Sequence, residues 1–145
     1  LPPEAQAQAG FAEAELAAKY FVELQYYVAQ TNDLATWEQV VSPESNYANR
    51  VSALAIERQE LGVRLGYEGL TIESIKVRQG AENSNRFQIF LIVRMGNEYA
   101  LDSTGKLVEE NGGKEIYFET YVEFYGDAWK LVGAADYSER PEGLD

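Results

Sequence analysis

Residues 11–41 read FAEAELAAKYFVELQYYVAQTNDLATWEQVV, and this stretch decides the fold. Over residues 11–30 the apolar side chains recur at steps of three and four positions, which predicts an amphipathic helix. The polar break at residues 31–33 follows, where Asn32 or Asp33 can cap a second, short helix over residues 34–41. The side chains expected on the buried stripe of the first helix are Ala14, Ala17, Phe21, Leu24 and Val28.

The rest of the chain predicts one more helix and then only strands. The third helix is expected over residues 43–61, with Pro43 in its first turn, and Val63 and Leu65 prolonging it. Its expected apolar side chains are Tyr47, Val51, Leu54, Ile56 and Leu61. From residue 69 the apolar period changes to two, which predicts strands over residues 70–79, 86–95, 98–102, 115–125 and 128–136. Helices followed by hairpins predict an α+β fold, with N-terminal helices packed on a strongly curved, mainly antiparallel sheet.

The composition excludes several classes of function. Twelve basic and 24 acidic residues give a formal net charge of -12. Such a surface repels phosphate backbones and anionic head groups, so we expect no nucleic-acid partner and no electrostatic binding to membranes. The chain has no cysteine and no histidine, which excludes disulfides, thiolate metal sites and histidine-based catalytic triads. We therefore expect neither a metal nor a cofactor.

The two ends of the chain differ in composition from the middle. Residues 1–10, LPPEAQAQAG, are rich in proline, alanine and glutamine and lack apolar periodicity, which is typical of a linker. We expect a removed leader or a tether ahead of them, and an arbitrary trim of a flexible terminus is the alternative. Residues 11–136 are expected to form one domain, and the polar residues 137–145 a flexible tail.

Three segments carry a family resemblance: residues 17–28, the motif NDLATW at residues 32–37 and the motif GDAWKLV at residues 126–132. With these segments the chain resembles the nuclear-transport-factor-2-like superfamily, which includes the SnoaL-like proteins, over residues 11–136. The resemblance implies a cystatin-like, cone-shaped fold. In that fold a strongly bent sheet wraps the first helix and leaves a pocket at the wide end of the cone.

A closer resemblance is carried by residues 34–43 and by the motif LDSTGKLV at residues 101–108. In these segments the chain is similar to a family of uncharacterised actinobacterial lipoproteins. The resemblance implies export and a cell-surface lipid anchor ahead of the domain, with a cytoplasmic location as the alternative. Many members hold a cysteine pair just after the Ser-Pro, where this chain has ESNY at residues 44–47.

The superfamily also includes enzymes, such as ketosteroid isomerases and scytalone dehydratases. Their chemistry needs a carboxylate in a dry pocket beside a donor for the developing oxyanion. The residues of the long strand that could supply these groups are Glu119, Thr120 and Glu123, together with Tyr117, Tyr121 and Tyr125. Alternation along that strand favours a different interpretation, in which the tyrosines and glutamates face outward and the better core set, Ile116, Phe118, Val122 and Phe124, faces inward. We carry over no catalytic residue.

Aromatic side chains are the candidates for a binding site. The candidates for lining a ligand pocket are Tyr20, Tyr27, Trp37, Tyr47, Phe90 and Trp129, with core filling as their alternative role. Tyr117, Tyr121 and Tyr125, with Phe90 and Ile92, are the candidates for a dimer interface. We expect a non-catalytic extracytoplasmic domain that binds a small apolar molecule or a protein partner. The alternatives are a small isomerase, dehydratase or hydrolase using a pocket carboxylate, and a homodimerisation module.

Overall fold

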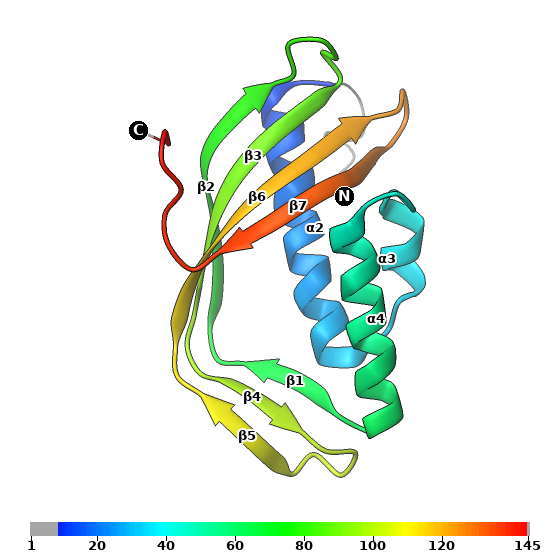
Figure 1. Ribbon diagram of the computed structural model, residues 1–145, viewed down its shortest axis with the longest axis vertical. Helices are drawn as coiled ribbons and strands as arrows, with labels where there is room; N and C mark the ends of the chain where they lie inside the picture. The colour runs from blue at the N-terminus through cyan, green and yellow to red at the C-terminus, as the bar shows by residue number, and fades with distance from the viewer. Residues whose placement is uncertain (1–8, 145) are drawn as a thin grey trace.

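A computed structural model describes residues 9–144 of the chain. Its elements are α2 (Phe11–Thr31), α3 (Ala35–Val40), α4 (Asn46–Leu61), β1 (Arg64–Tyr67), β2 (Leu70–Gln79), β3 (Arg86–Met95), β4 (Glu98–Leu101), β5 (Leu107–Asn111), β6 (Lys114–Phe124) and β7 (Trp129–Tyr137). Figure 1 shows all three helices on the concave side of a strongly bent sheet. The predicted α+β class is therefore confirmed. Within the described residues, no helix has the length and apolar character needed to cross a membrane.

The sheet has an upper and a lower half that continue one another across a bend. The upper half has the strand order β2-β3-β6-β7 and the lower half the order β1-β4-β5, with antiparallel neighbours throughout. Short connections join β1 to β2, β3 to β4 and β5 to β6. At two of them only glycine fits, because an added Cβ at Gly96 would lie 2.5 Å from the carbonyl oxygen of Glu68, and one at Gly113 would lie 2.9 Å from that of Met95.

Helix α2 fills the concavity of the sheet. Its predicted buried stripe is confirmed, since every one of the five side chains is at most 8% exposed. Ala14, Ala17 and Ala18 are fully buried, and their small side chains let the helix backbone approach the strands closely. The bulkiest buried side chains around this helix are Trp37, Trp129, Phe21, Phe87 and Phe118.

Helix α4 differs from its prediction at its start and on its buried side. The Ser45 hydroxyl accepts a hydrogen bond from the Ala48 amide at 3.1 Å, so Ser45 is the N-cap and Pro43 lies outside the helix. The expected apolar residues Leu54, Ile56 and Leu61 are 44%, 47% and 69% exposed. The buried side consists instead of Ala48, Val51 and Ala55, because short side chains allow close packing against α2 and β7.

Two strands were not predicted. Gly62, at φ 67°, ends α4, and β1 follows at once, so the expected helical turn at Val63 and Leu65 is wrong. Strand β5 is exposed along its whole length, so its sequence has no apolar alternation to reveal it. The other five strands lie within one residue of their predicted bounds.

The two ends of the chain differ in how much of each the structure describes. Of the predicted linker, residues 1–8 lie outside the described residues. In the C-terminal segment, Leu144 is 5% exposed and the Arg78 guanidinium donates a hydrogen bond to the carbonyl of Gly143 at 2.8 Å. Figure 1 shows this segment beside β2. The flexibility of residues 137–145 stays a prediction.

Candidate functional site

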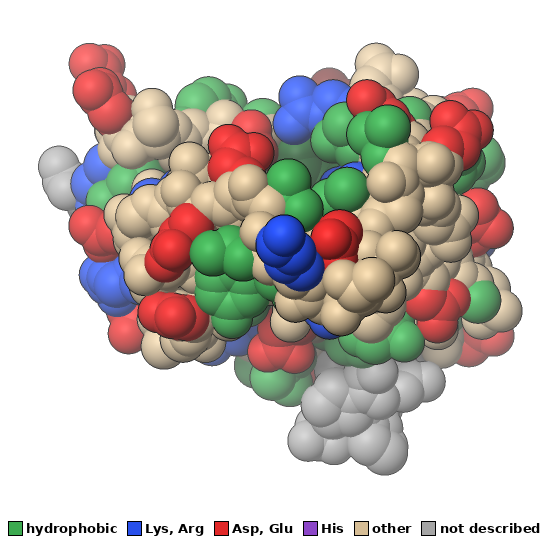
Figure 2. Space-filling model, turned by 90° about the horizontal axis from the view of Figure 1, so that it is seen from below, with side chains coloured by type: hydrophobic (Ala, Val, Ile, Leu, Met, Phe, Trp, Pro, Cys, Tyr) green, Lys and Arg blue, Asp and Glu red, His purple; other side chains and the backbone are tan. Residues whose placement is uncertain are grey.

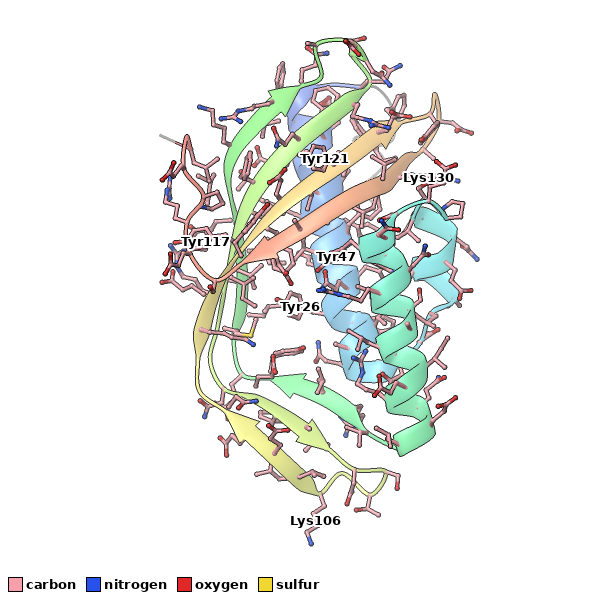
Figure 3. The ribbon with its side chains drawn as sticks, viewed as in Figure 1. Tyr26, Tyr47, Lys106, Tyr117, Tyr121 and Lys130 are labelled. Atoms are coloured by element: carbon pink, nitrogen blue, oxygen red, sulfur yellow. The ribbon has the colours of Figure 1, made fainter. Side chains whose placement is uncertain are left out.

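Three tyrosines from distant parts of the chain meet inside the cone. Tyr26 comes from α2, Tyr47 from α4 and Tyr67 from β1. The Tyr26 and Tyr67 rings meet edge to face, with centroids 5.0 Å apart and planes at 89°. The Tyr47 hydroxyl donates a 2.7 Å hydrogen bond to the side-chain oxygen of Gln25. Figure 3 shows Tyr26 and Tyr47 between the sheet and the helices, with Tyr117 at the opposite side of the sheet.

Burial keeps these three hydroxyls protonated. Desolvation raises the pKa of Tyr26, Tyr47 and Tyr67 well above the ordinary 10.0. Nearby negative charge adds to the rise, chiefly from Asp136 for Tyr47 and from Glu98 for Tyr67. Tyrosines are protonated at neutral pH in any case, and the raised pKa values keep these three neutral hydrogen-bond donors at alkaline pH as well.

Of this cluster, Tyr47 also lines a groove on the surface, which we call the mouth groove. It has a volume of about 290 Å³ and is lined by Asn46, Tyr47, Arg50, Ala134, Ala135 and Asp136. Arg50 lies 3.8 Å from the Asp136 carboxylate, and its guanidinium carbon is 5.6 Å from the centre of the Tyr47 ring. The Arg50 and Asp136 side chains are 63% and 41% exposed, so they form a polar rim beside the Tyr47 ring.

A second groove, which we call the edge groove, lies on the other side of Asp136. Its volume is about 560 Å³, and its lining residues are Lys114, Glu115, Ile116, Asp136, Tyr137 and Ser138. These residues come from the start of β6 and the end of β7. Asp136 therefore separates the two grooves and lines both.

Of the six predicted pocket residues, Tyr47 alone lines either groove. Trp37 and Trp129 are at most 1% exposed and lie in the core, where the Trp37 indole donates to the carbonyl of Ala48. Phe90 is buried under the Arg78 guanidinium, 5.5 Å from its ring centre. Tyr20 packs against Phe21, and Tyr27 is 45% exposed. The structure does not bring these six side chains together.

The tyrosines and glutamates of β6 lie on the outer face of the sheet, as the alternation predicted. Glu119 accepts hydrogen bonds from Tyr121, from Gln88 at 3.1 Å and from Tyr137 at 3.1 Å. Burial and the bond to Glu119 raise the pKa of Tyr121 to about 12. Of the three interface candidates, Tyr117 and Tyr121 are half-buried and Tyr125 is 51% exposed.

The buried carboxylate of the described residues lies on this outer face as well. Glu123 is 9% exposed and accepts from Arg86 and Asn83, both at 2.9 Å. The bond from Tyr125 and then the contact with Arg86 hold the pKa of Glu123 below its usual range. It is an ionised acceptor outside the cone. Thr120, on the inner face, donates to the Ile89 carbonyl at 2.9 Å and is occupied structurally.

Sequence reasoning missed most of the site. Tyr26 is not among the five residues expected on the buried stripe of the first helix, although it follows Val22 by four residues and so lies on the same face as that residue. Both side chains are buried, at 5% and 2% exposure. No sequence pattern pointed to Tyr67, Arg50 or Asp136 as site residues. They come together only through the packing of three separate elements, β1, α4 and β7.

Comparisons with known proteins agree on the fold. No protein-family model matches the chain, and no curated protein matches it in sequence. The intermembrane space region of the chloroplast protein ARC6 is similar in structure, with a TM-score of 0.72 at 12% identity over 91% of this chain and 99% of that one. An uncharacterised protein with a cystatin-like fold from Caulobacter vibrioides gives 0.52 at 7% identity, over 92% and 93% of the two chains. Aln2 from a Streptomyces species gives 0.51 at 8% identity, over 90% and 94%.

The chain thus has a cystatin-like fold, and the predicted fold class is confirmed. Its membership of the nuclear-transport-factor-2-like superfamily stays a prediction. At these identities the likeness concerns the fold alone.

Proposed function

We propose that this chain is a non-catalytic binding domain that takes a small apolar ligand, or an apolar side chain of a partner, in its mouth groove. The observation that carries the proposal is the lining of that groove, where the half-buried ring of Tyr47 lies beside the small side chains of Ala134 and Ala135. Ligand sites of this kind are mostly apolar, with a few polar groups that orient the ligand. Here Arg50 and Asp136 supply the polar rim.

The chemistry of the groove favours binding over catalysis. An isomerase, dehydratase or hydrolase of this fold would need a desolvated carboxylate in the concavity. The carboxylate at the mouth, Asp136, is exposed and paired with Arg50. The buried carboxylate Glu123 is on the outer face and has a lowered pKa. Glu98, whose charge acts on Tyr67 inside the cone, is paired with Lys114 at 3.3 Å. A carboxylate held in an ion pair is a poor candidate for a general base.

We also propose that the domain works outside the cytoplasm, as the folded part of a lipid-tethered protein related to the actinobacterial lipoproteins. The resemblance in residues 34–43 and 101–108 supports this context. The similar fold of the ARC6 intermembrane space region offers a parallel, since that domain is a region of a larger protein in a compartment next to membranes.

Titration with Nile red, a neutral apolar dye, tests the binding proposal. The wild-type protein should give a saturable rise in dye fluorescence. Ala134→Leu extends a side chain into the groove and should weaken dye binding about tenfold, since it removes the space for roughly one buried apolar side chain. The matched control is Ala53→Leu on the exposed side of α4, which should leave the affinity unchanged. Thermal unfolding of both variants verifies that each is folded.

Two results would contradict the proposal. One is the absence of saturable dye binding to the folded wild-type protein. The other is equal affinity in Ala134→Leu and Ala53→Leu, which would place the dye elsewhere on the surface.

A further inference from the structure

The two halves of the sheet differ by one strand. The lower order β1-β4-β5 continues the upper order β2-β3-β6, but the lower half has no strand in line with β7. The pairing of β7 with β6 begins at Tyr137 and Tyr117. Below that point the chain leaves the sheet, and Figure 1 shows the segment after β7 running up beside β2, away from β5.

This difference leaves an open sheet edge of eight residues. Residues 114–116 of β6 pair with β3 on one side only, and β5 pairs with β4 on one side only. We call these two segments together the open edge. Along such an edge every second residue presents its backbone amide and carbonyl outward, without a partner strand.

The edge groove lies where the missing strand would begin. It is bounded by residues 114–116 on one side and by residues 136–138, where β7 ends, on the other. Its volume of about 560 Å³ is therefore the space beside the open edge, in line with β7. An extended segment placed there would pair with β6 and β5 in the manner of an added strand.

The side chains along the open edge indicate what kind of segment fits. Leu107 and Val108 are 50% and 62% exposed and offer apolar contacts. Acidic groups outnumber basic ones, with Glu109 and Glu110 exposed on β5 and Glu115 and Asp136 at the edge groove. Figure 2, which views the molecule from below, shows acidic side chains scattered over this end, with basic ones at its centre and around it. Lys114 is the one basic residue within the open edge and is paired with Glu98 at 3.3 Å. A segment with basic side chains matches this charge.

The same charges disfavour the alternative occupant, a second copy of the chain. Pairing of two β5 edges across a twofold axis would place Glu109 and Glu110 against the same residues of the other copy. Like charges directly opposite each other destabilise a strand pair. A net charge of -12 on each copy adds to the repulsion.

We propose that the open edge, Leu107–Asn111 with residues 114–116, binds an extended, lysine- or arginine-bearing segment of a partner protein as an added strand. This surface is separate from the mouth groove, so the proposal goes beyond the function proposed above. Ala134→Leu probes the groove and charge swaps on β5 probe the edge, so that either proposal can fail alone.

Fluorescence anisotropy with a synthetic peptide tests the inference. The probe is a labelled seven-residue peptide of alternating valine and lysine with threonine at both ends. We expect saturable binding that weakens as salt is added. The control is the same peptide with N-methyl groups on its three central residues. It lacks backbone N–H donors on both sides of the extended strand and should not bind. Equal binding of the two peptides would overturn strand addition.

Charge swaps locate the site. Glu109→Lys combined with Glu110→Lys should weaken binding of the lysine peptide about tenfold and should improve binding of a peptide with glutamate in place of lysine. Glu57→Lys with Glu60→Lys, on the exposed end of α4, makes the same change in net charge and should leave both affinities within about twofold. If the double variant does not fold, Glu109→Lys alone replaces it in the test, because this single variant keeps the hydrogen bond from Asn97 to Glu110.

Three results would overturn the inference. The first is no saturable binding of the lysine peptide up to about 1 mM. The second is an equal loss of affinity in the β5 and α4 swaps. The third is a sedimentation mass near twice 16.3 kDa that falls to the monomer value in Glu109→Lys with Glu110→Lys, because the edge would then hold a second copy.

Discussion

At the scale of single residues, Asn32 joins the end of α2 to the end of α4 and to Val63, just before the lower half of the sheet. Its backbone is left-handed, at φ 59°, and ends α2. Its side-chain amide donates to the Val63 carbonyl and accepts from the Arg58 guanidinium, both at 2.8 Å. The sequence suggested Asn32 or Asp33 as a cap for the second helix. Asp33 does accept from the Ala35 amide at 3.1 Å, whereas Asn32 stabilises the helix before it.

Substitutions of Asn32 separate its two roles. Asn32→Ala loses both side-chain hydrogen bonds and puts alanine, which tolerates left-handed backbone less well than asparagine does, at this position. We expect the free energy of unfolding to fall by about 2–4 kcal/mol. Asn32→Gly loses the same bonds, but glycine adopts left-handed backbone without steric cost, so this variant should cost about 1 kcal/mol less. Asn49→Ala removes an exposed bond to the Pro43 carbonyl and is the control. Urea unfolding measures all three, and a cost for Asn32→Ala no larger than for Asn49→Ala would contradict this role.

At the scale of elements, the start of α4 depends on one side chain. Ser45 is 2% exposed and caps the Ala48 amide, while the Ala48 carbonyl accepts from Trp37. We expect Ser45→Ala to lower the free energy of unfolding by about 1 kcal/mol. Ser103→Ala, in an exposed turn, should change it by less than about 0.5 kcal/mol. Equal values for the two variants, measured by urea unfolding, would show that the cap contributes nothing.

The elements also show how far the sequence could predict the structure. The central strand β3 (Arg86–Met95) matches its predicted bounds, because its apolar side chains recur with a period of two and Gly96 follows its last residue. The first helix was equally clear from its alanine stripe. Strand β5 was missed, because an exposed strand has no apolar alternation in its sequence. The buried side of α4 was missed, because alanine gives a weaker hydrophobic signal than the exposed leucine and isoleucine of the same helix. The site was harder still, because Tyr26, Tyr47 and Tyr67 meet only through the packing of three elements.

At the scale of the whole molecule, the packing of the cone removes three tyrosines, one fully buried and two half-buried, from most of their contact with water. Tyr26, Tyr47 and Tyr67 all have pKa values raised above the ordinary 10.0 by burial. An unfolded chain releases these protons near pH 10, whereas the folded protein holds them to higher pH. The contribution of these tyrosines to stability is therefore fully present below pH 10.0 and is lost as the pH rises toward the folded-state pKa values.

The size of this loss can be estimated and measured. At one pH unit above the ordinary pKa, each tyrosine held neutral costs about 1.4 kcal/mol of stability, so the three together cost about 4 kcal/mol. That is a large part of the roughly 5–15 kcal/mol that stabilises a typical domain. We expect urea unfolding, followed by tryptophan fluorescence, to show stability that is level from pH 7 to 9 and falls steeply above pH 10. The slope of the free energy of unfolding against pH above pH 10 counts the protons released on unfolding, and Tyr26→Phe should lower that count by about one. The free energy of unfolding of Tyr26→Phe at pH 8 gives the separate cost of altered packing. Stability that stays level to pH 11 would show that the tyrosine hydroxyls inside the cone are open to water. Tyr47, which lines the mouth groove, would then lack the desolvated surroundings that the binding proposal assigns to it.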